Sequence, residues 1–143
     1  IGIELDNTGW TPFPMPQMDV LVALVADIRT RWGIATEGVL GHSDFAPTRK
    51  ADPGRRFDWC RLAREGQAVW PDPTEDEAEA SDEAFLAAAG AFVYPVGDGA
   101  AAVLDAMRQR FRPWVSGPLD RTDLAIVRDL ARRFPVDRAA PTA

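Results

Sequence analysis

The sequence has one cysteine, one histidine and no long apolar run among its 143 residues. A single cysteine, Cys60, cannot form an intramolecular disulfide, so a small scaffold held by disulfides is excluded. The longest apolar run covers residues 20–26 and is far shorter than the roughly 20 residues that a membrane-spanning helix needs. The sequence therefore predicts no membrane span.

Basic residues are outnumbered, with 16 Lys and Arg against 22 Asp and Glu, which gives a net charge of −6. Nonspecific nucleic-acid binding needs a basic surface that neutralises phosphates, so we expect no nucleic-acid partner. The same charge disfavours electrostatic docking to an anionic membrane. Apolar residues make up 46% of the chain, which is enough for a packed core.

The first 66 residues have the pattern of a layered α/β domain. Residues 1–5 alternate apolar and polar side chains like a half-buried strand, and residues 38–41 read as a second, short strand. A helix is predicted over residues 17–32 and another near residues 58–64, with a polar loop at 42–56 between them. This order predicts an α/β fold, with a mixed sheet and flanking helices. A strand at the first residue needs neighbours to pair with, so we expect the domain to begin before Ile1.

The second half has a different composition. Residues 71–83 are rich in Asp and Glu and contain no basic residue, which is typical of a solvated linker. Beyond them, apolar residues at helical spacing predict three helices near residues 82–92, 98–111 and 120–134. We therefore predict a domain at residues 1–66, an acidic linker at 67–81 and a small all-α, three-helix domain at 82–138.

His42 and Asp52 are the first candidates for chemistry. His42 follows a predicted strand end, and Asp52 stands ten residues later in a turn stiffened by Pro53. A neutral imidazole and a carboxylate are ordinary zinc ligands at about 2 Å from the metal. However, a lone histidine is more often a structural residue, and a catalytic zinc usually has three protein ligands. These residues alone leave both interpretations open.

The segment that contains both residues resembles a known family. Residues 41–54 read GHSDFAPTRKADPG and are followed by Phe57-Asp58-Trp59. This is similar to the metal-ligand loop of the zinc-dependent N-acetylmuramoyl-L-alanine amidases, the family that also includes peptidoglycan-recognition proteins. The family's loop reads His-x-Asp-x-Ala-Pro-x-Arg-Lys-x-Asp-Pro-Gly, and every fixed position is met. Residues 1–4 also resemble the family's catalytic strand, at the family's distance from the loop.

The resemblance covers residues 1 to 66 and implies the C-terminal part of an amidase catalytic domain. Such a domain hydrolyses the amide bond between N-acetylmuramic acid and L-alanine in peptidoglycan or in muropeptides. The resemblance implies Zn²⁺ as the cofactor and His42 and Asp52 as two of its ligands. Glu4 would accept a proton from the zinc-bound water, and Lys50 would stabilise the oxyanion of the tetrahedral intermediate. The family's third ligand is a histidine on an earlier strand, which a segment before Ile1 is expected to supply.

Each of these residues also has an ordinary structural interpretation. Glu4 would be an outward strand residue in a surface ion pair, and Lys50 would be a solvated loop residue. Arg49 is interpreted as structural, pairing with Asp44. Four further residues are interpreted as parts of the scaffold, Asp58 as a helix cap and the others as core residues: Phe57, Asp58, Trp59 and Cys60.

A second and weaker resemblance covers residues 103–130. The stretches MRQRFRP and VSGPLDRT are similar to the three-helix peptidoglycan-binding module that is often attached to such amidases. Met107-Arg108 replaces the usual Phe-Gln, and Ser116 replaces the usual Asp, which puts glycan binding in doubt but not the fold. Five arginines either meet an acidic muropeptide or form solvated helix faces: Arg108, Arg110, Arg112, Arg121 and Arg128.

Two other functions remain open at the level of sequence. The first is a muropeptide-binding module that lacks one zinc ligand and has no catalysis. The second is an interaction protein whose helical module docks a partner. For the amidase, a polymeric peptidoglycan substrate implies the bacterial cell envelope, whereas a soluble muropeptide is equally compatible with the cytoplasm.

Overall fold

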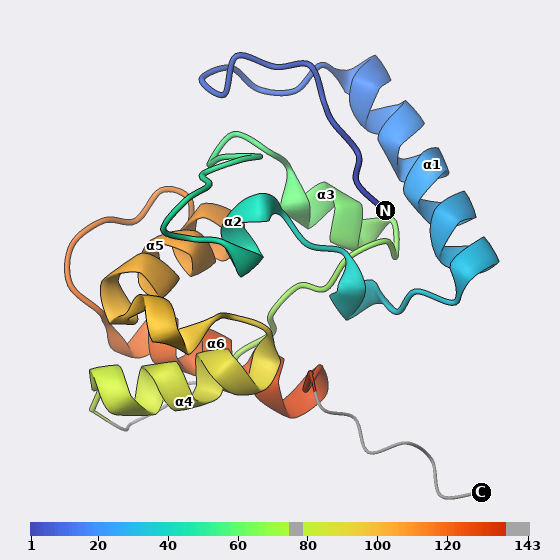
Figure 1. Ribbon diagram of the computed structural model, residues 1–143. Coiled ribbons are helices and arrows are strands. Elements are labelled where there is room, and N and C mark those ends of the chain that lie inside the picture. Colours follow the sequence, from blue (N-terminus) through green and yellow to red (C-terminus); the bar gives the residue numbers. More distant parts are fainter. Residues whose placement is uncertain (75–78, 137–143) are drawn as a thin grey trace, which may run out of the picture.

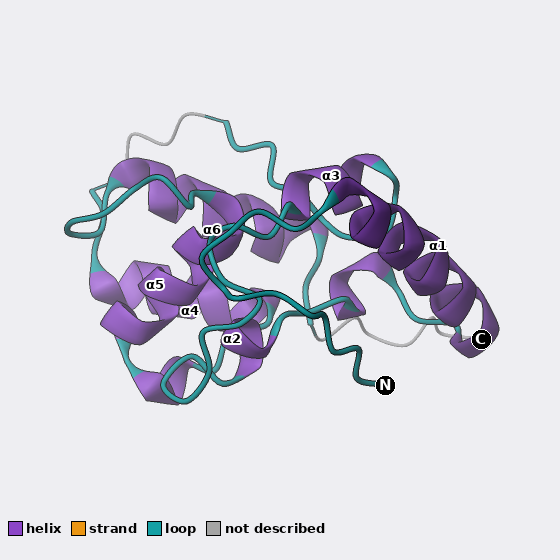
Figure 2. Ribbon diagram, turned by 90° about the horizontal axis from the view of Figure 1, so that it is seen from above, coloured by secondary structure: helices purple, strands orange, loops and turns teal. Residues whose placement is uncertain are grey.

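The computed structural model describes residues 1–74 and 79–136, and its regular secondary structure in these ranges is entirely helical (Figure 1). In Figure 2 the helices are joined only by loops and turns over these residues. No helix in the described ranges is both long and apolar enough to cross a bilayer. The elements are α1 (Met15–Trp32), η1 (Thr36–Gly38), α2 (His42–Phe45), α3 (Trp59–Arg64), α4 (Asp82–Phe92), η2 (Val96–Asp98), α5 (Ala100–Phe111) and α6 (Arg121–Arg133).

The α/β fold predicted for the first 66 residues is therefore wrong for the described chain, which contains no strand. Alternating side chains show which residues face an apolar surface, but a strand also needs a neighbour that pairs with its backbone. Residues 1–5 have no such neighbour among the described residues, and Ile3 and Leu5 pack instead against the apolar cluster beside α1. The second predicted strand is a 3-10 turn in its first part, where Gly38 N–H donates to Ala35 O.

Helix α1 lies along the edge of the molecule, next to the N-terminal segment (Figure 1). It ends at Gly33, whose φ of 62° is the left-handed conformation that glycine adopts most easily. Its buried residues are Met18, Leu21 and Val25, which pack in one cluster with Phe57, Trp59, Leu62 and Ala68. Val20 and Trp32 recur at the same helical spacing as the buried residues, yet they are 67% and 70% exposed. The helix thus buries a narrower face than its apolar spacing alone indicates.

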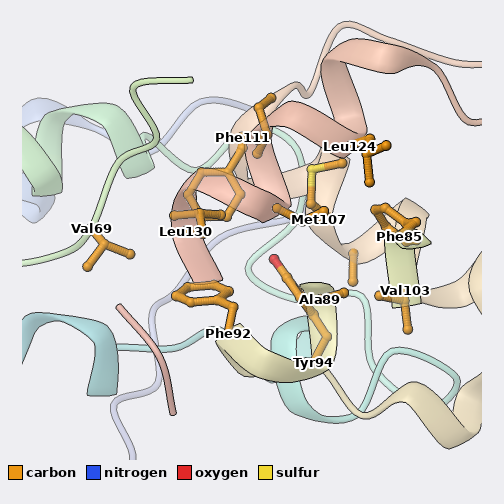
Figure 3. Packing of buried hydrophobic residues seen from close by; sticks show 13 residues of the cluster. Val69, Phe85, Ala89, Phe92, Tyr94, Val103, Met107, Phe111, Leu124 and Leu130 are labelled. Carbon is orange, nitrogen blue, oxygen red and sulfur yellow. The ribbon is translucent and has the colours of Figure 1, made fainter. Parts of the chain in front are cut away.

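The second cluster forms between α4, α5 and α6 (Figure 3). These helices lie where the apolar spacing predicted them. Asp120 caps α6, because its side chain accepts from Asp123 N–H. The most deeply buried side chains of the cluster are Phe85, Ala89, Val103, Met107, Leu124, Val127 and Leu130.

The two clusters meet at the segment that follows α3. Ala68 belongs to the first cluster, Val69 to the second, and Trp70 packs against both. These residues fall in the region 67–81 that was predicted as an acidic linker, of which residues 75–78 lie outside the described chain. The division at residues 66 and 82 remains a prediction, but the packing shows that the two helical groups share a contact region rather than being joined only by solvated chain.

Asp129 fastens the start of the acidic segment to α6. Its carboxylate accepts from Asp72 N–H at 2.8 Å and pairs with Arg133 and Arg132, each also at 2.8 Å. Burial alone raises the pKa of Asp129, but the Asp72 N–H and the two guanidinium groups outweigh it and hold the pKa below its usual value.

A pKa lowered by folding stabilises the chain above the unfolded value near pH 4, and the stabilisation is lost as the pH falls through the folded pKa. Asp129→Asn is therefore expected to reduce the loss of stability between about pH 6 and about pH 3. Urea unfolding at the two pH values measures this difference. Asp27→Asn, at an exposed carboxylate of α1, serves as the control. An Asp129→Asn variant with the wild-type pH dependence would contradict this role.

Candidate functional site

Short-range hydrogen bonds organise the loop that carries His42 and Asp52. His42 is the first residue of α2, and the carboxylate of Asp44 accepts from Gly41 N–H at 2.8 Å, as a cap of this short helix. The backbone N–H of Ser43 donates to Asp52 O at 3.0 Å. The backbone of Asp52 is therefore hydrogen-bonded directly to Ser43, the residue after His42.

The side chains of His42 and Asp52 are in contact, through Nδ1 of the imidazole and Oδ2 of the carboxylate. Both remain accessible, with side chains 33% and 53% exposed. The Phe45 ring lies edge-on to the imidazole, with ring centroids 5.5 Å apart. The structure thus brings the two predicted metal ligands within reach of a common point that solvent can enter.

A cavity of about 670 Å³ opens beside this pair and is lined by all four predicted site residues, Glu4, His42, Lys50 and Asp52. Glu4 and Lys50 are exposed. The rest of the lining includes apolar side chains of the first cluster: Phe13, Leu21, Val25, Phe57, Trp59 and Leu62. A mostly apolar pocket with a few converging polar groups is the usual form of a small-molecule site.

The fit of a zinc ion to this site can be judged from the donor atoms that the side chains offer. An imidazole nitrogen and a carboxylate oxygen in contact match two of the three protein ligands of a catalytic zinc. No group of three side chains able to hold a metal ion occurs within residues 1–74 and 79–136. The described residues therefore fit two positions of such a site. The roles of Glu4, Lys50, His42 and Asp52 remain predictions.

The scaffold residues around the site are mostly as predicted, with exceptions. Asp58 caps α3 by accepting from Arg61 N–H at 2.9 Å, and Phe57 and Trp59 are buried. Asp44 caps α2, but its ion-pair partner is Arg110 rather than Arg49. Cys60 is only partly buried.

Three of the five arginines of the helical module are buried or largely buried, whereas both sequence-based interpretations place them at the surface. Arg108 and Arg110 are 3% and 2% exposed, so they neither form a solvated helix face nor present a surface to a ligand. Arg112 is also largely buried and pairs with Asp120 and Asp123, whereas Arg121 and Arg128 are exposed. Sequence reasoning missed these buried pairs because an arginine within an amphipathic helix has the same local pattern whether its partner is water or a distant carboxylate.

The sequence matches a known family over the part that forms this site. Residues 1–55 match the model of the family described as N-acetylmuramoyl-L-alanine amidase. The N-acetylmuramoyl-L-alanine amidase AmiD of Escherichia coli is 44% identical over 81 residues, 50% of this chain and 29% of the relative. The 1,6-anhydro-N-acetylmuramyl-L-alanine amidase AmpD of Enterobacter cloacae is 46% identical over 62 residues, 43% of this chain and 33% of the relative.

Solved structures show a similar arrangement over nearly the whole chain. The E. coli AmiD structure, in complex with the substrate anhydro-N-acetylmuramic acid-L-Ala-D-γ-Glu-L-Lys, has a TM-score of 0.84 and 32% identity. The match covers 94% of this chain and 62% of that one. AmpDh3 of Pseudomonas aeruginosa has a TM-score of 0.78 and 26% identity, over 86% of this chain and 55% of that one.

Over residues 1–55 the chain is similar to the N-acetylmuramoyl-L-alanine amidase family. The aligned part spans about a third of the length of the curated relatives.

Proposed function

We propose that the protein hydrolyses the amide bond between N-acetylmuramic acid and L-alanine, with zinc as the cofactor. The observation that supports this most directly is the contact between His42 and Asp52 in a cavity that Glu4 and Lys50 also line. All four residues lie within the segment that matches the amidase family. A related amidase has been solved with an anhydro-muramyl tripeptide as its substrate, which makes a muropeptide the first substrate to test.

The proposed roles follow from the chemistry of the four groups. His42 and Asp52 would supply two of the zinc ligands, and bound zinc acts as a Lewis acid that polarises carbonyl groups and acidifies water. The Glu4 carboxylate would accept a proton from the attacking water and deliver it to the leaving amine of L-alanine. The Lys50 ammonium would face the negative charge that develops on the carbonyl oxygen and stabilise the transition state more than the bound substrate.

The helical module is proposed to be of the peptidoglycan-binding type. Support comes from the likeness to the AmiD structure, which extends over 94% of this chain and so includes residues of the module. Arg108, Arg110 and Arg112 are engaged in ion pairs within the protein and are not proposed to contact glycan. Arg121 and Arg128 are the exposed arginines of the earlier set.

A second candidate function is muropeptide binding without catalysis. The observation in its favour is that His42 is the single histidine of the sequence and that the described residues hold no group of three potential ligands. The two candidates differ in one measurable property, because only the enzyme requires zinc between His42 and Asp52.

Zinc titration of the chain, followed by NMR of the imidazole, tests the proposal. Since His42 is the only histidine, its ring gives a single set of imidazole signals, and these are expected to shift as zinc is added. Asp52→Asn should weaken this binding by at least about tenfold, because a ligand carboxylate is lost. Asp27→Asn serves as the matched control, since Asp27 is an exposed carboxylate of α1 paired with Arg31.

Imidazole signals that stay unchanged at saturating zinc, together with retained muropeptide binding, would favour the non-catalytic binder. Equal zinc affinity in Asp52→Asn and in the wild type would remove Asp52 from the proposed ligand set.

A further inference from the structure

A buried arginine of the helical module reaches the loop that carries His42. Arg110 projects from α5, and its side chain is 1% exposed. Its guanidinium donates to Asp44 Oδ2 at 2.6 Å and to Val39 O at 3.2 Å, and it lies over the Trp59 ring at 4.1 Å from the ring centroid. Arg110 therefore contacts the segment before α2, the short helix α2 itself and the start of α3.

Asp44 transmits this contact to the residue before His42. Its carboxylate is as deeply buried as Arg110 and accepts from Gly41 N–H at 2.8 Å. Tyr94 is a core residue of the helical module (Figure 3). Its hydroxyl donates to the other oxygen of Asp44 at 3.2 Å. Oδ2 of Asp44 thus accepts both from Arg110 of the module and from the backbone at which α2 begins, and Oδ1 accepts from Tyr94.

Trp59 supports the same place by packing. A Cβ atom on Gly41 would lie 3.2 Å from Trp59 Cζ2 and 2.6 Å from Pro53 Cδ, so the three residues are in close contact. Gly41 precedes His42, and Pro53 follows Asp52. The residues next to both predicted ligands therefore pack together, against the aromatic ring over which the Arg110 guanidinium lies.

Stability alone does not account for this arrangement. A buried ion pair contributes little net stability, because the cost of removing both charges from water offsets their attraction. What such a pair does provide is a defined geometry, since a planar guanidinium donates in fixed directions and a carboxylate left without it would be buried and unpaired. The pair joins positions 44 and 110, which lie 66 residues apart.

We propose that Arg110 is a positioning residue for the zinc site, and that the helical module, through Arg110 and Tyr94, holds the loop on which His42 and Asp52 meet. The inference rests on the proposed function, in which those two side chains bind zinc. The module then has a role within the amidase site in addition to any contact with peptidoglycan. Groups that support metal ligands from behind commonly change metal affinity by 10- to 100-fold when they are replaced.

The test measures zinc affinity of the whole chain from the His42 imidazole signals, in Arg110→Lys and Asp44→Asn. Lysine keeps the charge but cannot reproduce the guanidinium's directions or its stacking on Trp59. Asparagine keeps an oxygen for Gly41 N–H but removes the charge. Each variant is expected to bind zinc about tenfold more weakly than the wild type. Tyr94→Phe, which removes one hydroxyl, should have a smaller effect of the same sign.

The matched control is Arg55→Gln, at another part of the same contact between the two halves. Arg55 pairs with Asp105 of α5 and donates to Pro113 O, but it touches none of Asp44, Gly41 or Trp59. The zinc affinity of Arg55→Gln is expected to stay within about twofold of the wild type, because partly exposed ion pairs contribute little to stability.

Circular dichroism and thermal unfolding establish whether each variant is folded. If Arg110→Lys and Asp44→Asn are both unfolded, the zinc affinity of Tyr94→Phe is the deciding measurement. Wild-type affinity in folded Arg110→Lys and Asp44→Asn, or in Tyr94→Phe when it stands alone, would overturn the inference. Equal losses in Arg55→Gln and Arg110→Lys would also overturn it, because any loosening of the contact would then be enough. If the His42 signals of the wild-type chain do not change when zinc is added, the proposed function is contradicted. The inference, which rests on it, is then contradicted as well.

Discussion

Glu4→Gln is expected to lower kcat of the amidase by about 10²- to 10⁴-fold while zinc affinity stays within about twofold. Glutamine has nearly the same shape as glutamate, but it cannot accept a proton from water. Glu4 lines the cavity beside His42 and is exposed, so its replacement is expected to change the fold very little. The measurement is the rate at which a new L-alanine amino group appears from a muropeptide, with zinc content determined on the same sample.

The separation of rate from metal content distinguishes Glu4 from the predicted ligands. His42→Ala and Asp52→Ala should lose zinc and activity together, whereas Glu4→Gln should lose only turnover. Glu65→Gln, an exposed carboxylate outside the cavity, is the control and should keep the wild-type rate. If Glu4→Gln keeps the wild-type kcat, Glu4 is a surface residue as in the structural alternative and has no part in the mechanism.

Asp123→Ala is expected to destabilise the chain by about 3–5 kcal/mol, the usual effect of removing one partner from a buried ion pair. Asp123 has no exposed surface. Its carboxylate pairs with Arg108 and Arg112, each at 2.5 Å, and also accepts from Asp120 N–H at 3.0 Å as part of the cap of α6. Alanine would leave the Arg108 charge buried, with the carbonyl groups of Gly117 and Pro118 as hydrogen-bond acceptors and the Asp120 carboxylate 4.0 Å away.

Urea unfolding of Asp123→Ala at neutral pH measures this loss of free energy. Asp27→Ala removes an exposed carboxylate that pairs with Arg31 one helical turn away and is expected to cost only about 0.3–0.5 kcal/mol. The comparison sets a buried carboxylate that also caps α6 against an exposed one, and each change deletes one aspartate that pairs with arginine. If the two variants lose similar amounts of unfolding free energy, the buried Arg108–Asp123 pair stabilises the helical module no more than an exposed pair stabilises α1.

Local features of the fold were predictable from the sequence. The apolar spacing placed α1 and α4 within two residues of their observed bounds, and Asp58 was identified as the cap of α3. These features depend on residues three or four positions apart. The patterns that predict them can therefore be read from a short stretch of sequence. The predicted sheet failed because pairing is not a local property, and residues 1–5 have no strand partner within the described chain.

The candidate site divides in the same way. The residue types and spacing of residues 41–54 indicated His42 and Asp52 as a pair, and the structure places their side chains in contact. No local pattern indicated that Asp44, in the same loop, would pair with Arg110 of the helical module. Arg110 was interpreted as a surface residue because its own neighbours along the helix contain nothing that distinguishes a buried guanidinium from a solvated one.

The sequence by itself indicated the family that residues 1–55 resemble, the four candidate site residues and the helices of the second half. Only the tertiary structure decided which charges are buried, that the described chain has no sheet, and that α5 supports the loop of the predicted zinc ligands. The physical reason is the distance along the sequence over which each interaction acts. Caps, helical periodicity and ligand spacing act over a few residues, whereas desolvation and the choice of an ion-pair partner depend on groups that folding brings together from distant positions.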